Sequence, residues 1–343
     1  MAQNILNIKV GTFNLMNLMM PNVKVYGSMH ISPRDFEKKA EWINFMLNQM
    51  NADIIGFQEC FHKEALECII RQNRLYQHAE VVIGDETGDQ PKVALLSRYP
   101  IQDVQVFHKF PQNSIISISN RARELVELPF TTFSRPVLKV KVLIPNYGVI
   151  TFFVVHLKSK RPIFYDGENE NNPIDLARAQ VRSLMLRAAE SSAIRSLLLD
   201  SLQGRDCPVV LFGDVNDTGN SVTSRIISGE VPQHKLPDNV KKNAWDVILY
   251  HVKDIQARRS YQDFYYTHIH NGMYESLDHI MVSQEFVTDN PRYIGRVGQV
   301  MLFNDHLIDQ TFSNERPNKY TSDHGVVVCS LELDIERANK YRF

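Results

Sequence analysis

Residues 208–217, with the sequence PVVLFGDVND, join a strand-like run to side chains that could do chemistry. The run is β-branched and aromatic, as expected of a strand buried on both faces, and Gly213 then lets the backbone turn or approach another group closely. Asp214 and Asn216 lie two residues apart, so in an extended chain their side chains share a face. They offer oxygen ligands that Mg²⁺ accepts and an amide donor for a phosphate oxygen. Alone, such residues more often form an ordinary turn.

The same pattern, an apolar strand next to a polar side chain, recurs along the chain. The further positions are Asn14, Glu59, His156, Asp278, Asp323 and His324. So many repetitions favour one shared site over a series of separate turns. The residue types suit hydrolysis of a phosphate ester, in which carboxylates and amides hold one or two divalent metals and a histidine oriented by a carboxylate deprotonates water. Oxygen ligands without cysteine favour Mg²⁺ or Mn²⁺ over a structural zinc.

A framework of strands and helices must bring these side chains together. We predict strands at residues 5–13, 53–58, 209–212, 276–283 and 326–333, a hairpin over 137–156, and helices over 33–50, 174–202 and 244–257. Ser32 can cap the first helix, with Pro33 as its first residue. The succession of strands between residues 101 and 144 indicates antiparallel or mixed pairing. No repeat or linker interrupts the sequence, so we expect a single domain over residues 1–343.

Composition narrows the class of protein. The 343 residues carry 38 Lys and Arg against 39 Asp and Glu, so no global field attracts nucleic acid and any polyanion site must be local or metal-assisted. The four cysteines show no paired spacing and predict neither a disulfide framework nor a zinc ribbon. The start of the chain lacks a secretory pattern, and the apolar runs are too short to span a bilayer. We expect a soluble, cytoplasmic protein without a membrane partner.

Seven short motifs together resemble the endonuclease/exonuclease/phosphatase superfamily, to which deoxyribonuclease I belongs. They are TFNLMNL, DIIGFQEC, FSRPVLKVKV, VVHLKS, LFGDVNDT, SLDHIMVS and TSDHG, and they cover nearly the whole chain. Each motif alone is only weakly specific for the superfamily, but their order and spacing together are highly specific for it. HLKS, GDxND, LDHI and TSDH look most like bacterial nuclease-like members. The resemblance implies a four-layered α/β sandwich, in which two packed mixed β-sheets are flanked by helices and the site lies at one end.

The resemblance also implies roles for individual residues. Glu59 resembles the main ligand of the metal, which we expect to be Mg²⁺, with Mn²⁺ as the alternative, and Asn14 and Asp323 would lie close to that metal. His324 resembles the general base, and Asp278 resembles the carboxylate that holds it.

Further positions resemble the residues that handle the phosphate. Asp214 and Asn216 would orient the nucleophile and bind phosphate, and His156 would face the scissile phosphate. Arg135, in FSRP, falls where deoxyribonuclease I has an arginine that touches its substrate. Lys158 belongs to the basic patch after His156 and is a second candidate substrate contact, although such lysines also occur in plain solvated loops. The chain has no acid where deoxyribonuclease I has the glutamate partner of its second histidine.

Three functions are compatible with this sequence. The first is a metal-dependent phosphodiesterase that hydrolyses nucleic acid, with DNA as the expected substrate. The second is a phosphatase or phosphodiesterase that acts on a small molecule or a lipid head group, which the nearly neutral charge favours. The third is a binding module with a retired site, which the complete set of chemical groups disfavours.

Overall fold

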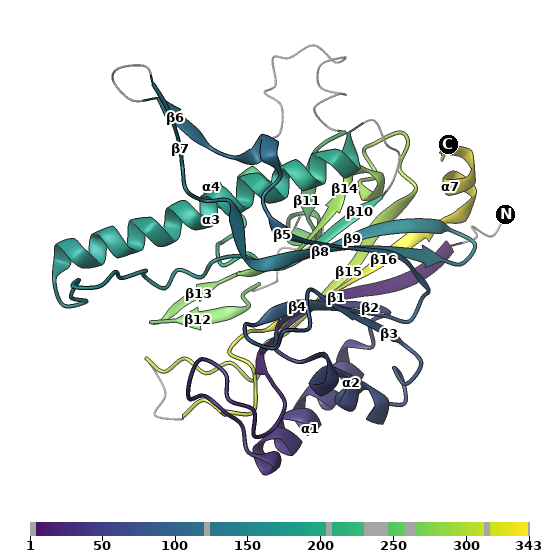
Figure 1. The fold of residues 1–343 in the computed structure, drawn as a ribbon. Helices are drawn as coiled ribbons and strands as arrows, with labels where there is room; N and C mark the ends of the chain where they lie inside the picture. The colour runs from purple at the N-terminus through teal and green to yellow at the C-terminus, as the bar shows by residue number, and fades with distance from the viewer. Residues whose placement is uncertain are drawn as a thin grey trace.

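Two six-stranded sheets form the centre of the protein (Figure 1). The computed structural model describes residues 5–119, 124–203, 208–229, 246–257, 265–311 and 316–341. The first sheet has the order β15-β16-β1-β2-β4-β3 and the second the order β11-β14-β10-β9-β8-β5. Each is mixed, because β1 pairs with β2, and β10 with β9, in parallel while their other neighbours are antiparallel. This confirms the predicted pair of mixed sheets.

The strands have the following bounds. The first sheet contains β1 (Ile5–Leu18), β2 (Ile54–Cys60), β3 (Glu80–Ile83), β4 (Lys92–Ser97), β15 (Gly295–Phe303) and β16 (Val326–Asp334). The second contains β5 (Ile101–Lys109), β8 (Thr132–Ile144), β9 (Gly148–His156), β10 (Val209–Asp214), β11 (Leu249–His251) and β14 (Asp278–Ser283). Two small hairpins are formed by β6 (Ser117–Ser119) with β7 (Leu125–Glu127), and by β12 (His268–His270) with β13 (Met273–Glu275).

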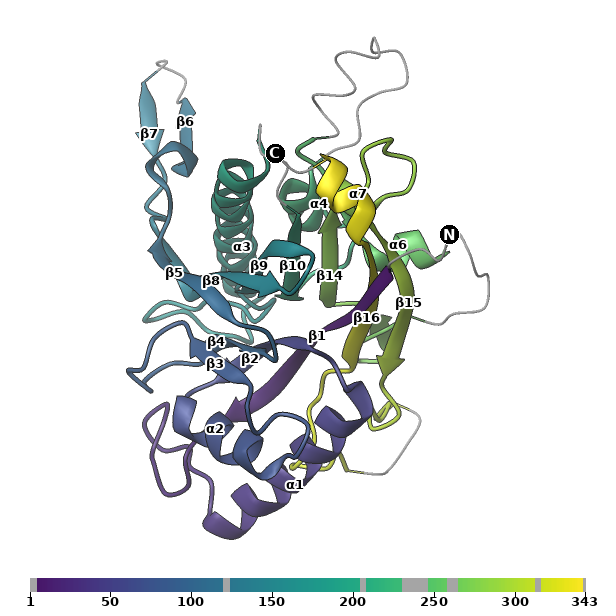
Figure 2. The ribbon, with the colours of Figure 1, turned by 90° about the vertical axis from the view of Figure 1, so that its right-hand side faces the viewer.

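Helices cover the outer faces of both sheets, which completes the predicted four layers (Figure 2). The helices α1 (Pro33–Met50) and α2 (Lys63–Gln72) lie on the first sheet, and α3 (Pro173–Leu202) and α4 (Val222–Ser228) lie on the second. Shorter helices are α6 (Val252–Ala257) and α7 (Ile335–Tyr341), and short 3-10 turns are η1 (Gln112–Ser114) and η2 (Gln284–Phe286). In the part of the chain that the structure describes, no helix has the length and apolar character needed to cross a membrane.

The predicted start of α1 is confirmed, because the Ser32 hydroxyl accepts a hydrogen bond from the Asp35 N–H at 3.1 Å and Pro33 opens the helix. The helix predicted over residues 244–257 is wrong in its middle, since residues 249–251 form β11 and only Val252–Ala257 are helical. Its first two residues lie outside the described part of the chain. A three-residue edge strand is too short to show a strand period in the sequence.

The two sheets share a continuous apolar core, and one glycine shows how closely they approach. A Cβ atom at Gly56 of β2 would lie 2.2 Å from the ring of Phe212 on β10, so any larger residue there would push the sheets apart. The glycine in the GFQE phrase therefore serves sheet packing. Because β1 and β2 face β9, β10 and β14 across this core, the strand ends of both sheets meet at one end of the sandwich.

Candidate active site

Three neighbouring strands of the second sheet bring His156, Asp214 and Asp278 side by side. In the strand register, Asp214 of β10 pairs with His156 of β9 on one side and with Asp278 of β14 on the other. All three side chains are buried. Gly213 has a φ of +147°, and a Cβ there would lie 2.0 Å from the carbonyl oxygen of Val155, so only glycine allows this close approach of β10 to β9.

The first sheet supplies Asn14 and Glu59 to the same place. The Asn14 amide nitrogen lies 3.4 Å from Glu59 Oε1 and 3.3 Å from Asp214 Oδ2, so this buried amide connects the two sheets. The Asn17 N–H donates to Glu59 Oε2 at 3.0 Å. Glu59, Met16 and Asn17 have φ values of 59°, 47° and 59°, in the left-handed region that non-glycine residues seldom adopt. Such strained backbone concentrates at functional sites, where the surrounding structure holds it in place.

His324 and Asp278 form the shortest side-chain contact of the site. His324 Nδ1 lies 2.8 Å from Asp278 Oδ2, and His324 Nε2 lies 3.7 Å from Asp214 Oδ2. Burial alone would lower the pKa of His324, but the charges of Asp278 and Asp214 and the hydrogen bond to Asp278 outweigh burial and raise that pKa well above its ordinary value. A cation bound at Asp214 would offset the charge of that carboxylate and lower the pKa of His324 again.

His156 differs from His324 in its surroundings. Its Nε2 atom lies 3.5 Å from Asp214 Oδ2, while its Nδ1 atom is buried and has no hydrogen-bond partner among the described residues. Burial, and then the positive charges of Arg135 and His324, hold the pKa of His156 well below its ordinary value. The ring is therefore neutral at neutral pH, which suits a hydrogen-bond donor to phosphate better than a proton source.

Asn216 and Arg135 converge on one backbone oxygen. The Asn216 side-chain amide and the Arg135 guanidinium each donate to the Leu157 carbonyl at 3.0 Å, directly after His156. The Asn216 N–H donates to Asp214 Oδ1 at 2.8 Å and so fixes that carboxylate. Lys158 points elsewhere, because its ammonium donates to oxygens of Ser159 and Arg161 in its own loop. In the part of the chain that the structure describes, the side chains of Arg135 and Lys158 donate to backbone oxygens and not to a carboxylate of the site, and Lys158 donates also to the Ser159 hydroxyl.

Two further residues support the site and were not predicted. Buried Lys39 of α1 donates to the Met16 carbonyl at 2.9 Å, and burial lowers its pKa to about 8 against the opposing charges of Glu59 and Asp323. Buried Glu190 of α3 accepts from the backbone N–H groups of Ser134 and Lys158, both at 2.7 Å. In the sequence, each of these two residues is a charged residue within the apolar stripe of its helix. Burying a charged side chain costs free energy unless it is paired, so such a residue indicates a partner.

The donor set fits a divalent metal. Asp278 Oδ1 is buried without a hydrogen-bond partner among the described residues, and burial raises the pKa of Asp214 to about 7, so a bound cation would offset the cost of burying these carboxylates. Glu59 and Asp214 present carboxylate oxygen atoms to the Asn14 amide nitrogen across the sheet ends, and exposed Asp323 lies next to His324 at the rim. These are the hard ligands that Mg²⁺ and Mn²⁺ prefer.

A cavity of about 660 Å³ adjoins this cluster on the side of Asp323. His268 and His270 of β12, His306, and Ser322 also line it. His306 Nε2 lies 2.9 Å from the His324 carbonyl oxygen and so holds the backbone of that residue. A volume of several hundred Å³ is typical of ligand sites.

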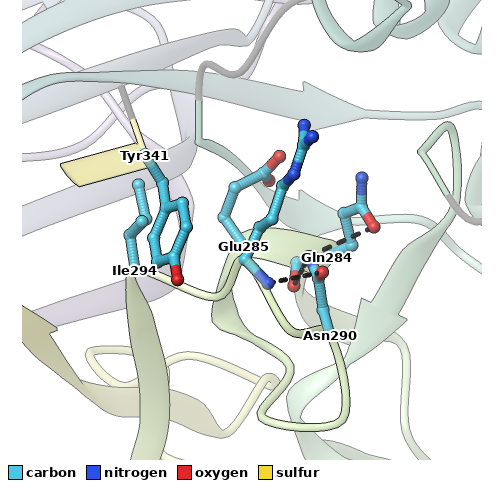
Figure 3. A pocket seen from close by; sticks show the side chains of 6 residues that line it. Gln284, Glu285, Asn290, Ile294 and Tyr341 are labelled. Carbon is cyan, nitrogen blue, oxygen red and sulfur yellow. Dashed lines mark hydrogen bonds between the residues drawn. The ribbon is translucent and has the colours of Figure 1, made fainter. Parts of the chain in front are cut away.

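A second pocket, at the other end of β14, is lined by Gln284, Glu285, Asn290, Ile294 and Tyr341 (Figure 3). The Asn290 amide donates to the backbone and side-chain oxygens of Gln284, both at 3.3 Å. The pocket has a volume of about 30 Å³, room for a water molecule but not for a substrate.

A sequence model of the Endonuclease/Exonuclease/phosphatase family matches residues 12–324, so the chain belongs to this family. The resemblance predicted from the seven motifs is thus confirmed. Members of the family are phosphoric ester hydrolases that typically depend on divalent metals.

Solved structures of similar fold come from animals and bacteria. The human Nocturnin catalytic domain with bound sulfate is 13% identical, with a TM-score of 0.57 and 97% of each chain covered. Truncated Caenorhabditis elegans TDP2 is 14% identical, with a TM-score of 0.56, and the match covers 95% of this chain and 97% of that one. A Bacteroides thetaiotaomicron mannosyl-6-phosphatase is 15% identical, with a TM-score of 0.53 and coverages of 94% and 99%. The search of curated proteins gave no match.

Proposed function

We propose that the protein is a divalent-metal-dependent phosphodiesterase that hydrolyses nucleic acid, as an endonuclease on DNA, by in-line attack of a water molecule that His324 activates. The observation that supports this proposal is the connected cluster in which Asn14 joins Glu59 to Asp214, and Asp214 lies between His156 and the His324–Asp278 pair. With the roles proposed here, metal ligands, a base and a phosphate donor would lie within reach of one reacting group.

The proton steps follow from the hydrogen bonds of His324. With Nδ1–H donated to Asp278, the lone pair of Nε2 can accept the proton of the attacking water, and the Asp278 carboxylate stabilises the resulting imidazolium. Asp214, fixed by the Asn216 N–H, lies beside Nε2 and can orient that water. Asn14, Glu59 and Asp323 would hold the metal, which when bound neutralises charge on the phosphate.

The phosphate would meet His156 and Arg135 on the opposite side of Asp214. A neutral His156 donates a hydrogen bond to a phosphoryl oxygen, and the nearby Arg135 guanidinium adds positive charge that suits a phosphodiester. Lys158 would contact substrate only after leaving the oxygens of its own loop. We also propose that residues 1–343 form one domain and that the protein acts in the cytoplasm, in keeping with the free cysteines Cys60, Cys68 and Cys329.

The alternative substrate is a small phosphoester. The cavity beside Asp323 has the volume of a ligand site, and one structure of similar fold is a mannosyl-6-phosphatase. This alternative uses the same metal ligands and the same base.

Hydrolysis assays with Mg²⁺ or Mn²⁺ distinguish these substrates. Supercoiled plasmid, linear duplex, single-stranded DNA, RNA and a panel of phosphomonoesters would be compared, with a chelator control. We expect metal-dependent nicking of plasmid that His324→Ala abolishes and that His108→Ala, at an exposed histidine of β5, leaves intact. Turnover of a small phosphoester with inert nucleic acids would refute the nuclease proposal, and full activity of His324→Ala would refute the site.

A further inference from the structure

A group of nitrogen and oxygen ligands lies at the mouth of the cavity, next to the oxygen-rich cluster. His268, Asp323 and His324 each offer one ligand atom, and these atoms lie within 4.8 Å of one another. The set differs from the Glu59 and Asn14 end of the site because it contains two imidazoles. Imidazole ligands suit Zn²⁺ and similar transition metals, whereas Mg²⁺ selects oxygen ligands.

His268 is held in position by the residue before it. The Thr267 hydroxyl accepts hydrogen bonds from the N–H groups of Leu277 at 2.9 Å and Asp278 at 3.1 Å. The Thr267 carbonyl accepts from the Gly325 N–H at 2.6 Å. These bonds tie the start of β12 both to the strand that carries Asp278 and to the residue after His324, so His268 is fixed relative to both.

The two histidine rings have nitrogen atoms available for a metal. The ring centroids of His268 and His324 lie 5.0 Å apart, and His268 Nδ1 is buried with no hydrogen-bond partner among the described residues. Because His324 Nδ1 is bound to Asp278, its Nε2 atom is left to coordinate. A carboxylate behind a ligating histidine is the usual outer-shell partner at zinc sites, since it fixes the ring and raises its basicity.

The geometry requires only small side-chain movements. Tetrahedral zinc with bonds of about 2.0–2.1 Å separates its ligand atoms by roughly 3.4 Å, which rotation of the exposed Asp323 and of half-buried His268 can provide. The adjoining cavity gives an ion access and leaves a fourth position for water.

We propose that His268, Asp323 and His324 form a Zn²⁺ site, and that Zn²⁺ bound there inhibits the enzyme. The inhibition follows because coordination occupies the lone pair of His324 Nε2, so the histidine can no longer accept a proton from water. This second part rests on the proposed role of His324 as general base, whereas the binding of Zn²⁺ does not.

Zinc binding by the metal-free full chain tests the site directly, through competition with a chromogenic zinc chelator. Loss of an outer-shell partner at such sites costs about 10–100-fold in affinity, so loss of a ligand in His268→Asn should weaken binding at least ~10-fold. The matched control is His270→Asn, two residues along the same strand and exposed, which should bind as the unmodified protein does. Thermal unfolding checks that each variant is folded.

Unchanged zinc affinity in His268→Asn would overturn the proposal, since the ion would then be held without His268, for example by His324 with Asp214. Equal weakening in His270→Asn, or no zinc uptake by the unmodified protein, would overturn it as well. Inhibition of the Mg²⁺-dependent activity should require more Zn²⁺ in His268→Asn by the same factor. If no substrate is hydrolysed at all, the proposed function fails while the binding measurement still decides the zinc site.

Discussion

The two sheets contribute halves of the site that differ in the regularity of their backbone. The second-sheet half, His156, Asp214 and Asp278, consists of neighbouring partners in a regular strand register and is buried. The first-sheet half leaves the register, because both the β1–β2 and the β2–β4 pairings shift near Glu59, which has left-handed backbone and is half-buried. We infer that the second-sheet half, whose backbone is regular, positions the groups that transfer protons and contact the phosphate. The first-sheet half, whose backbone is irregular at Glu59, provides oxygen ligands for a metal.

The largest expected effect is on the second-sheet half. Asp278→Asn keeps the shape of the side chain but removes the charge that orients and stabilises His324, and equivalent changes in catalytic triads cost about 10⁴-fold in kcat. We expect a loss of roughly 10³–10⁴-fold in kcat, with little change in KM, measured on the preferred phosphoester. A loss below tenfold would show that Asp278 does not act through His324.

The first-sheet half should respond to metal concentration. Glu59→Gln removes a charged ligand, so the Mg²⁺ concentration for half-maximal activity should rise by at least ~10-fold. A Mg²⁺ titration checks this, with Glu86→Gln, at an exposed glutamate, as the control. An unchanged Mg²⁺ requirement would remove Glu59 from the metal site.

Glu190 tests the comparison further, because it accepts hydrogen bonds from the N–H of Ser134, just before Arg135, and from the N–H of Lys158, two residues after His156. Glu190→Gln places an amide N–H against one of the two N–H groups that the carboxylate accepts, leaving that donor unsatisfied. We expect a loss of about 1–3 kcal/mol in the free energy of unfolding. Chemical denaturation measures this loss, and stability equal to that of the unmodified protein would contradict the bridging role.

The smallest effect concerns Lys39 and pH. Its folded pKa of about 8 lies below the ordinary 10.5, so between these values the unfolded chain binds more protons and stability should rise with pH. Lys39→Met should lack this rise, which is at most ~3 kcal/mol. Unfolding in the presence of chelator from pH 7 to 10.5 compares the two proteins, and parallel profiles would contradict a buried ammonium.

Much of this arrangement could be predicted from the sequence, because buried strands next to polar residues have a strong local signature. Gly213, Asp214 and Asn216 show the pattern within four residues. The contacts between sheets could not be predicted in this way, since the bond from Asn14 to Asp214 joins residues 200 positions apart. His268 was missed for a different reason: it follows a short stretch without strand period, and only the Thr267 hydrogen bonds place it beside His324.

The central claim is that both sheets build one metal-dependent site, and rescue by metal tests it most directly. Single-turnover hydrolysis would be followed over a Mg²⁺ range for the unmodified protein, Glu59→Gln and Asp278→Asn. We predict that excess Mg²⁺ restores a substantial share of the activity of Glu59→Gln and none of that of Asp278→Asn. Restoration of both, or activity of the unmodified protein that persists in chelator, would contradict the account.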